Sequence, residues 1–507
     1  MGRMTQTLKT IKYAFVAQIL RMVLNFVSKT IFLNVLGLEY SGVNGLFSNV
    51  LGVLSLSELG LGSAMTFALY KLVEENDIEK LKSYMAFYKK AYRVIAFVIA
   101  AVGLLLLPIL PYIIEGEEAI GISKIRVYYV VYLFNTVITY FVSYKHSILY
   151  AEQKSYVWSN LDMIFNFITI SAQIAILLIF RNFLAYLITA TVVGIIRQTF
   201  INYYMNKKYP YLKDKDYRKI SREELAPIKK NVKALILHNL GGVGVTQTDN
   251  IVISSFINIA TTGRVSYYNM VINAVNSIVD IVVNSAVNSV GNLIAKESVE
   301  KQHSIIEKYI FVNFWTSGFA CVGFYILLSP CVELVWGTDI LLMGNAVAAM
   351  VLAGYFSHQL NCINYIKTVA GIFEQDKFVP VLQTVINLTF SMILAKYIGI
   401  TGVYIGTIIQ AVFALVWKAI VTYKTLFNKS AKKYFQKQVV YMLAVVLAGA
   451  ICALIKNAVM ANGVTIINFA IMLVVVTVVT NLTFAILFCR TEEFKYLITT
   501  AKNLLKR

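Results

Sequence analysis

Two acidic residues within apolar stretches are the first residues of this chain that could do chemistry. Glu58 and Asp280 stand about 222 residues apart, and the same offset superimposes Glu152 on Glu374. An acid inside a membrane is costly and commonly serves binding or ion coupling. The spacing therefore predicts a duplicated membrane protein with one functional acid in each copy. The alternative interpretation is that both acids only cap helices or pair between them.

Polar residues on the first two spans of each copy predict a polar path through the protein. Arg21, Asn25 and Lys29 share one helical face of the first span. A ladder beginning at Asn269 repeats at steps of three and four along a later span. Such stripes would leave many groups unsatisfied in lipid, so we expect them to face protein or water. The alternative, that asparagines tie helices together, suits the two cations less well.

The predicted substrate-binding cavity residues are Arg21, Asn25, Lys29, Glu58, Arg197, Asn269, Asn273, Asn276, Asp280 and Asn284. The candidate ligands for a coupling ion are Asp249, Asp280 and Glu58. Asp162 could pair with Arg197, or either residue could belong to the path. His238 is interpreted as an interface residue whose hydrogen bonds are satisfied.

The composition predicts an all-α, polytopic membrane protein. Of its 507 residues, 58% are hydrophobic and only 14% are charged, and the mean hydropathy is +0.68, unlike any soluble domain. The first apolar stretch lacks the small-residue cleavage site of a signal peptide, so we expect it to remain as a helix. About fourteen stretches of about 20 residues could span a bilayer. They are 11–36, 42–70, 91–114, 122–149, 156–180, 183–205, 234–258, 263–294, 305–332, 343–371, 378–398, 402–423, 438–460 and 464–489.

Because each copy has six spans, the orientation of the chain is preserved and the repeat is of the parallel kind. We expect an N-lobe over 1–215, a cytoplasmic linker over 216–233 and a C-lobe over 234–430. The last two spans and a cytoplasmic tail, 431–507, are appended. The basic stretch around the linker could also recruit a partner enzyme.

The chain has a net charge of +20, and its lysines and arginines are concentrated in alternate connections between the predicted spans. The tails and even-numbered connections hold about 37 of the 46 lysines and arginines, and the odd-numbered connections about six. This bias predicts that both termini are cytoplasmic and that basic loops attract anionic membrane lipid. A nucleic-acid partner is not expected, because no separate basic domain is present.

The search for enzyme chemistry yields no candidate. The sequence has no Walker loop, no Ser-His-Asp set and no metal-ligand spacing. The five cysteines lie in or at the ends of apolar spans and are expected to pack as hydrophobic residues. We therefore expect no enzymatic activity, no cofactor and no metal.

Three segments carry a resemblance to a known family. They are VLGLEYSGVNGLFSNVLGVLSLSELGLGSAM (35–65), QTDNIVISSF with the following SYYNM (247–270), and GITGVYIGTIIQ (399–410). Over nearly its whole length the chain resembles the polysaccharide transporter branch of the multidrug/oligosaccharidyl-lipid/polysaccharide (MOP) flippase superfamily. The resemblance implies two six-helix lobes in a V, a cationic central cavity and alternating access.

The resemblance also implies a cargo, a location and partners. The cargo would be an undecaprenyl-diphosphate-linked oligosaccharide repeat unit of capsule, exopolysaccharide or O-antigen, moved to the outer leaflet of the bacterial plasma membrane. A polysaccharide polymerase and glycosyltransferases are the suggested partner proteins. Arg21 and Lys29 would hold the diphosphate, the first as a fork and the second as a point charge.

Two other functions remain open. A cation-coupled multidrug or metabolite antiporter of the same superfamily would be expected to carry an acidic pocket without these cations. A non-transporting scaffold for glycosyltransferases would leave the polar stripes unexplained. For the flippase, moving about two negative charges outward across 100 mV, inside negative, is downhill by roughly 4.6 kcal/mol, so the potential alone could drive transport.

Overall fold

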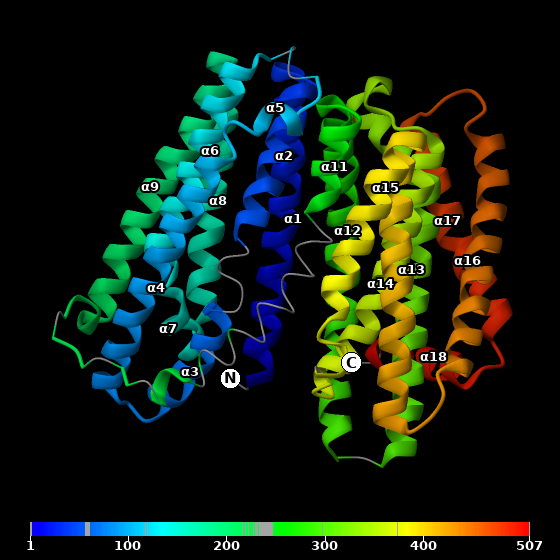
Figure 1. Cartoon of the computed structure of the whole chain (residues 1–507). Coiled ribbons are helices and arrows are strands. Elements are labelled where there is room, and N and C mark those ends of the chain that lie inside the picture. The colour runs from blue at the N-terminus through cyan, green and yellow to red at the C-terminus, as the bar shows by residue number, and fades with distance from the viewer. Residues whose placement is uncertain are drawn as a thin grey trace. The chain divides into compact units, whose positions relative to one another are not determined.

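Helices account for all the regular secondary structure in the described part of the computed structural model (Figure 1). The structure describes every residue except 1–2, 56–60, 117, 119, 215, 219, 222, 227, 229–231, 233–246, 297, 373 and 506–507. At the side-chain level, 3–19, 63–64, 280–296 and 500–505 are also outside the description. The chain divides into two compact units, Met1–Gly263 and Arg264–Arg507. The predicted four-part division stays a prediction.

The first unit is built from helices that largely follow the predicted spans. They are α1 (Arg3–Leu36), α2 (Leu38–Leu54), α3 (Leu61–Glu74), α4 (Ile78–Leu105), α5 (Leu110–Ile113), α6 (Ile122–Ser143), α7 (His146–Ala151), α8 (Ser155–Phe180), α9 (Phe183–Lys208), the 3-10 helix η3 (Pro210–Lys213) and α11 (Thr248–Phe256). Span 122–149 is divided into α6 and α7. Span 42–70 contains α2 and α3, and residues 56–60 between them lie outside the description. The earlier part of span 234–258 lies outside the described residues, and α11 is its end.

Polar caps and one glycine set several of these helix boundaries. Gly37 separates α1 from α2 with a φ of 89°, a conformation that costs glycine little. The side chain of Asp77 accepts a hydrogen bond from the Lys80 backbone N–H at the start of α4. Asn182 caps α9 in the same way. Each cap satisfies one of the free N–H groups of a helix start, so the short connections are defined locally by sequence.

The second unit comprises most of α12 and the helices after it. Its elements are α12 (Ile259–Lys296, which begins in the first unit), α13 (Val299–Trp336), η4 (Thr338–Ile340), α14 (Gly344–Val369), η5 (Glu374–Asp376), α15 (Val379–Phe427), α16 (Lys432–Val459), α17 (Ile466–Phe488) and α18 (Glu492–Leu505). The element α15 covers two predicted spans, which meet at non-helical residues Ile398 and Gly399. The predicted cytoplasmic tail contains a further helix, α18.

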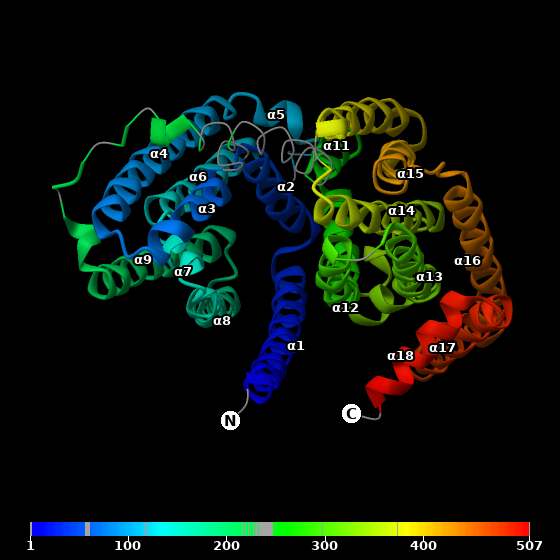
Figure 2. The ribbon, with the colours of Figure 1, turned by 90° about the horizontal axis from the view of Figure 1, so that it is seen from below.

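The appended pair α16 and α17 packs against α13 and against each other, along one side of the second unit (Figure 2). The ring of Phe314 stacks on Tyr441 with 4.1 Å between centroids, and Phe484 lies 5.0 Å away. About one turn before Tyr441 on α16, Lys437 donates a hydrogen bond at 2.7 Å to Glu307 of α13, which also accepts one from Tyr423 at 2.5 Å. Aromatic packing and a charge-assisted contact therefore attach the pair to its lobe.

Eight helices in the described ranges are long and apolar enough to cross a membrane. They are Ile122–Ser143, Ser155–Phe180, Phe183–Lys208, Val299–Trp336, Gly344–Val369, Glu374–Phe427, Lys432–Val459 and Ile466–Phe488. One of them contains two predicted spans. The all-helical, multi-pass class is confirmed, and the number of fourteen spans is consistent with it.

Two glycines allow α2 to cross the beginning of α12 with backbones in contact. A Cβ at Gly42 would lie 2.0 Å from the carbonyl oxygen of Ile259. A Cβ at Gly263 would lie 2.4 Å from the carbonyl oxygen of Leu38. No side chain fits between these backbones, which is the usual reason for glycine at a membrane helix crossing.

We predict that Gly42→Ala lowers the thermal unfolding midpoint of the purified protein in detergent by several degrees. The added methyl group must push two backbones apart, and overpacking of this kind typically costs ~1–3 kcal/mol. Gly354→Ala is the matched control, since no atom lies within 4 Å of its added Cβ. An equal effect of the two substitutions would contradict the close crossing.

Candidate functional site

A polar cavity of about 360 Å³ lies inside the first unit, between α1, α2, α6, α8 and α9. Most of its lining side chains are amides, hydroxyls or cations, and none is acidic among the described lining residues. The lining consists of Asn25, Ser28, Lys29, Phe32, Asn44, Asn135, Thr139, Asn166, Thr169, Ile170, Gln173, Tyr186, Ala190, Gly194, Arg197 and Gln198. We call this space the N-lobe cavity.

Helical periodicity explains why these side chains converge. On α1, Asn25, Ser28, Lys29 and Phe32 recur at steps of three, one and three, so they lie on one face. The lining residues of α8 and α9 recur in the same manner. Membrane helices with a polar face must turn it toward protein or water, because hydrocarbon offers no hydrogen bonds. The cavity is the place where several such faces meet.

A carboxylate shared by two arginines organises the cationic side of the site. Asp162 on α8 contacts Arg197 on α9, with 2.6 Å between Oδ1 and Nη2. Its other oxygen, Oδ2, lies 3.5 Å from Nη2 of Arg21 on α1. The predicted pairing of Asp162 with Arg197 is confirmed. The same carboxylate also lies within ion-pair distance of Arg21, a contact that sequence reasoning did not predict.

Arg197 belongs both to this ion pair and to the cavity wall. Its guanidinium carbon lies 5.1 Å from the centroid of the Trp158 ring, a cation–π geometry. Its Nε and the Oε1 of Gln198 are buried and have no hydrogen-bond partner among the described residues. Such groups usually have a partner in a native protein, so these two atoms are exceptions beside the cavity.

The described charged side chains at and beside the cavity are mostly positive. They are the cations Arg21, Lys29 and Arg197 and the carboxylate Asp162. The cations lie among amides, which can either donate or accept hydrogen bonds. The site therefore suits an anion that also carries hydroxyl groups.

The structure brings together only part of the predicted site. Arg21, Asn25, Lys29 and Arg197 gather at or beside the N-lobe cavity. Sequence reasoning missed the amides contributed by α6, α8 and α9. Three- and four-residue spacing, as in Asn166, Thr169 and Gln173, is the signal that could have found them. The missed amide residues are Asn135, Asn166, Gln173 and Gln198.

The remaining predicted residues lie elsewhere or outside the described part of the structure. Asn269, Asn273 and Asn276 are on α12 in the second unit, where Asn276 lies 3.1 Å from Nε2 of His358 on α14. Asp249 is in the first turn of α11.

Three of the predicted residues and one interface residue cannot be placed at side-chain level. Asp280 and Asn284 are helical positions of α12 whose side chains are outside the description. Glu58 and His238 lie outside the described residues altogether.

Polar side chains inside the second unit are largely hydrogen-bonded to one another. Lys418 donates to Asn364 at 3.0 Å and to Gln383 at 3.2 Å. Lys367 and Asp376 form a buried ion pair at 2.6 Å. These contacts join helices.

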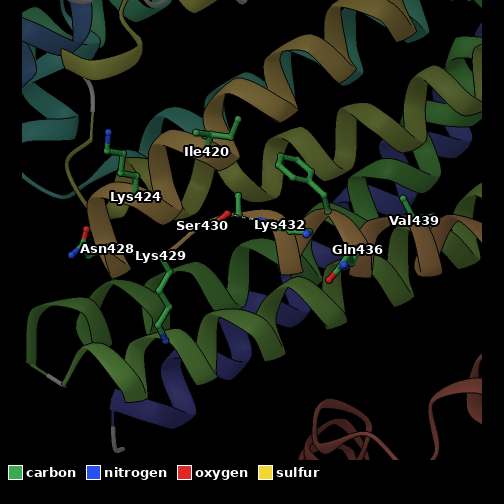
Figure 3. A pocket seen from close by; sticks show the side chains of 10 residues that line it. Ile420, Lys424, Asn428, Lys429, Ser430, Lys432, Gln436 and Val439 are labelled. Carbon is green, nitrogen blue, oxygen red and sulfur yellow. Dashed lines mark hydrogen bonds between the residues drawn. The ribbon is translucent and has the colours of Figure 1, made fainter.

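A surface groove of about 680 Å³ lies at the turn between α15 and α16 (Figure 3). Ile420 and Val439 form part of its lining, together with Lys424, Lys429 and Lys432. In Figure 3 the side chains of Lys424 and Lys429 point in opposite directions. The groove therefore presents a basic surface without a common focus for its charges. No group of three His, Cys, Asp or Glu residues able to hold a metal occurs in the described ranges.

Solved structures with a similar fold are transporters of the MOP superfamily. An inward-facing multidrug MATE transporter of that superfamily has a TM-score of 0.64 at 19% identity, over 81% of this chain and 96% of that one. The lipid II flippase MurJ, in an inward closed conformation, has a TM-score of 0.64 at 13% identity, over 93% and 98%. A MATE transporter of Vibrio cholerae, VcmN, has 0.56 at 14%, over 84% and 97%.

These likenesses support the MOP fold that the resemblance implied, and identities this low show the fold alone. The sequence matches no protein-family model and no curated relative. The chain is thus a multi-pass membrane protein with the fold of MOP transporters. Its assignment to the polysaccharide transporter branch stays a prediction.

We predict that Asp162→Asn destabilises the first unit, because the two arginines then face each other without a counter-charge. The three side chains are 25–37% exposed. The loss should therefore lie between ~1 kcal/mol for an exposed pair and ~3–5 kcal/mol for a buried one. Thermal unfolding in detergent measures it.

Two further variants test this electrostatic reason. Adding Arg197→Gln to Asp162→Asn should recover part of the loss, because one of the facing cations is removed. Glu75→Gln breaks an exposed helical pair with Lys71 and should change little. Failure of the double variant to recover any stability would argue against charge repulsion as the cause.

Proposed function

We propose that this protein is a flippase that moves polyprenyl-diphosphate-linked oligosaccharide from the cytoplasmic to the outer leaflet of a bacterial plasma membrane, for polysaccharide biosynthesis. The carrying observation is the N-lobe cavity, which combines cationic side chains with many amide groups. The MOP fold supports transport in general. The cargo, alternating access and location are part of the proposal.

The charge of the site fits the diphosphate of such a cargo. A diphosphate carries about two negative charges, and the described charged side chains at and beside the cavity are three cations and one carboxylate. Taking an isolated anion into about 30 Å of hydrocarbon costs tens of kcal/mol in the idealised limit. Lys29 would act as a point charge and Arg197 as a fork, held in place by Asp162. Arg21 would be a third cation beside the same carboxylate.

The amide lining fits the sugars. Sugar hydroxyl groups both donate and accept hydrogen bonds, as do the side chains of Asn25, Asn135 and Asn166. The apolar polyprenyl chain would stay in the lipid.

The driving force would be the potential across the membrane, which drives two negative charges outward. Asp249, Asp280 and Glu58 are the candidate ligands for an additional coupling ion.

A multidrug or metabolite antiporter is the second candidate, and one specific observation favours it. The TM-score to the inward-facing MATE transporter equals that to the MurJ flippase. The charge of the N-lobe cavity argues against a cationic drug there, since its lining contains lysine and arginine and no described acid. The partners proposed for the flippase are a polysaccharide polymerase and glycosyltransferases.

We predict that depletion of this protein makes lipid-linked oligosaccharide accumulate in the cytoplasmic leaflet, and that wild-type protein restores export. Lys29→Ala and Arg197→Ala should each reduce the rate of export by about tenfold or more, since each removes a charged contact to the diphosphate. The measurement is accessibility of the labelled lipid-linked sugar from each side of sealed vesicles.

The control is Lys495→Ala on α18, an exposed lysine far along the chain from the cavity. All variants must be present in the membrane at the wild-type level. Full export by both cavity variants would overturn the assignment of the cationic site.

The antiporter has its own prediction, made with the same depleted cells. If it is correct, depletion does not make lipid-linked oligosaccharide accumulate in the cytoplasmic leaflet. Depletion instead raises the sensitivity of the cells to cationic drugs. Neutralising Asp249 should then abolish drug efflux driven by an imposed ion gradient, because a protonatable or ion-binding carboxylate would be lost. Unchanged drug sensitivity on depletion would exclude this candidate.

A further inference from the structure

A second cavity lies at the end of the first unit where α4 begins, separate in its lining from the N-lobe cavity. It has a volume of about 730 Å³, which is within the range of small-molecule sites. Its walls come from α4, the α6–α7 turn, α9 and the segment from η3 to Tyr217. Its basic residues are Lys82, Lys89, Lys90, Arg93, Lys145 and Lys213. We call it the basic pocket.

The basic residues of α4 lie on one face of that helix. Lys82, Lys89 and Arg93 follow one another at steps of seven and four, with Met85 and Ala86 between them on the same lining face. Lys213 and Asp214 approach this face from the other side, and Lys82 and Asp214 are joined by an ion pair at 3.0 Å. The end of the segment predicted as the N-lobe is therefore folded against α4 and forms a wall of the pocket, to which Tyr217 of the predicted linker also contributes.

The most informative residue of the pocket is Lys145, whose side chain is only 2% exposed. Its Nζ lies 2.5 Å from the side-chain oxygen of Asn202 and 2.6 Å from that of Asn206, both on α9. An ammonium group has three N–H donors, so two are used by these amides and one is left. Burying a cation against neutral amides is costly, and a nearby anion would offset that cost. An ordinary solvated lysine on a basic loop needs no such pair of acceptors.

The pocket has an excess of positive charge that its own acids do not balance. Lys82 is paired with Glu79 and Asp214, and Lys90 lies 5.8 Å from the centroid of the Tyr217 ring. No carboxylate of the described residues makes an ion pair with the remaining four cations. These are Lys89, Arg93, Lys145 and Lys213.

We propose that the basic pocket binds a phosphate-bearing anion. The buried ammonium of Lys145 would contact a phosphate oxygen at the base of the pocket, and Lys89 and Lys213 would approach from its walls. The rings of Tyr211 and Tyr217 provide flat surfaces for the rest of the molecule.

Two sources can supply this chemistry. One is an anionic phospholipid headgroup, since Phe141 lines the pocket and is 41% exposed, which suits contact with acyl chains. The other is a soluble phosphorylated metabolite. The charge pattern predicts that this end of the unit is cytoplasmic, where both occur. The proposal does not depend on the cargo of the N-lobe cavity.

The test is binding by the full-length purified protein with two probes. Inorganic pyrophosphate is titrated by calorimetry against protein in nanodiscs of phosphatidylcholine. Retention of phosphatidylglycerol over phosphatidylcholine is measured by native mass spectrometry. The variants are Lys145→Gln, and Lys89→Gln with Lys213→Gln, the latter changing exposed side chains only. We expect each to weaken binding of the active probe by about tenfold or more.

The matched control is Lys424→Gln with Lys429→Gln, which removes two exposed lysines from the groove between α15 and α16 (Figure 3). It should leave binding unchanged. Selective loss for pyrophosphate would support a soluble ligand, and selective loss for phosphatidylglycerol would support a lipid headgroup. The proposal is overturned if neither probe binds wild-type protein, or if the control variant weakens binding as much as the pocket variants. The double pocket variant keeps the test valid if Lys145→Gln does not fold.

Discussion

Hydrocarbon cannot satisfy a hydrogen bond, so every polar group on a membrane helix must find its partner inside the protein or in enclosed water. The arrangement of the first unit follows from this constraint. A carboxylate such as Asp162 is costly when it faces lipid. Its oxygens instead lie 2.6 Å from Nη2 of Arg197 and 3.5 Å from Nη2 of Arg21. Meeting that need fixes the relative positions of α1, α8 and α9. The amide faces of the same helices then enclose the N-lobe cavity.

The second unit answers the same constraint in a different way. Its buried polar side chains are bonded to one another, as in the Lys367–Asp376 pair and the contacts of Lys418 with Asn364 and Gln383. Such contacts join the helices of this unit. In the first unit, by contrast, buried atoms of Arg197 and Gln198 have no partner among the described residues. Buried atoms without a described partner also occur in the second unit, as at Thr422 Oγ1 and Thr480 Oγ1, so the first unit is set apart by the cavity that its polar faces line.

Charge at the end of the first unit illustrates why burial matters more than the number of lysines. The basic loops follow a topological bias, and most of their lysines are exposed, as in the groove shown in Figure 3. Lys145 differs because α9 supplies two amide oxygens to a buried ammonium. A solvated charge contributes to orientation in the membrane, whereas a desolvated one selects a partner of opposite charge.

The sequence by itself determined the all-helical class, most helix positions and the candidate pair of Asp162 with Arg197. Hydrophobicity and helical period are local properties, which a short window of residues contains in full. Only the tertiary structure decided that Arg21 shares that carboxylate, since the two residues are 141 positions apart. It also decided which amide faces meet around a cavity, and that the segment directly after α9 folds onto α4. These outcomes depend on packing between distant helices, where a rotation that leaves the local pattern unchanged would bring different side chains together.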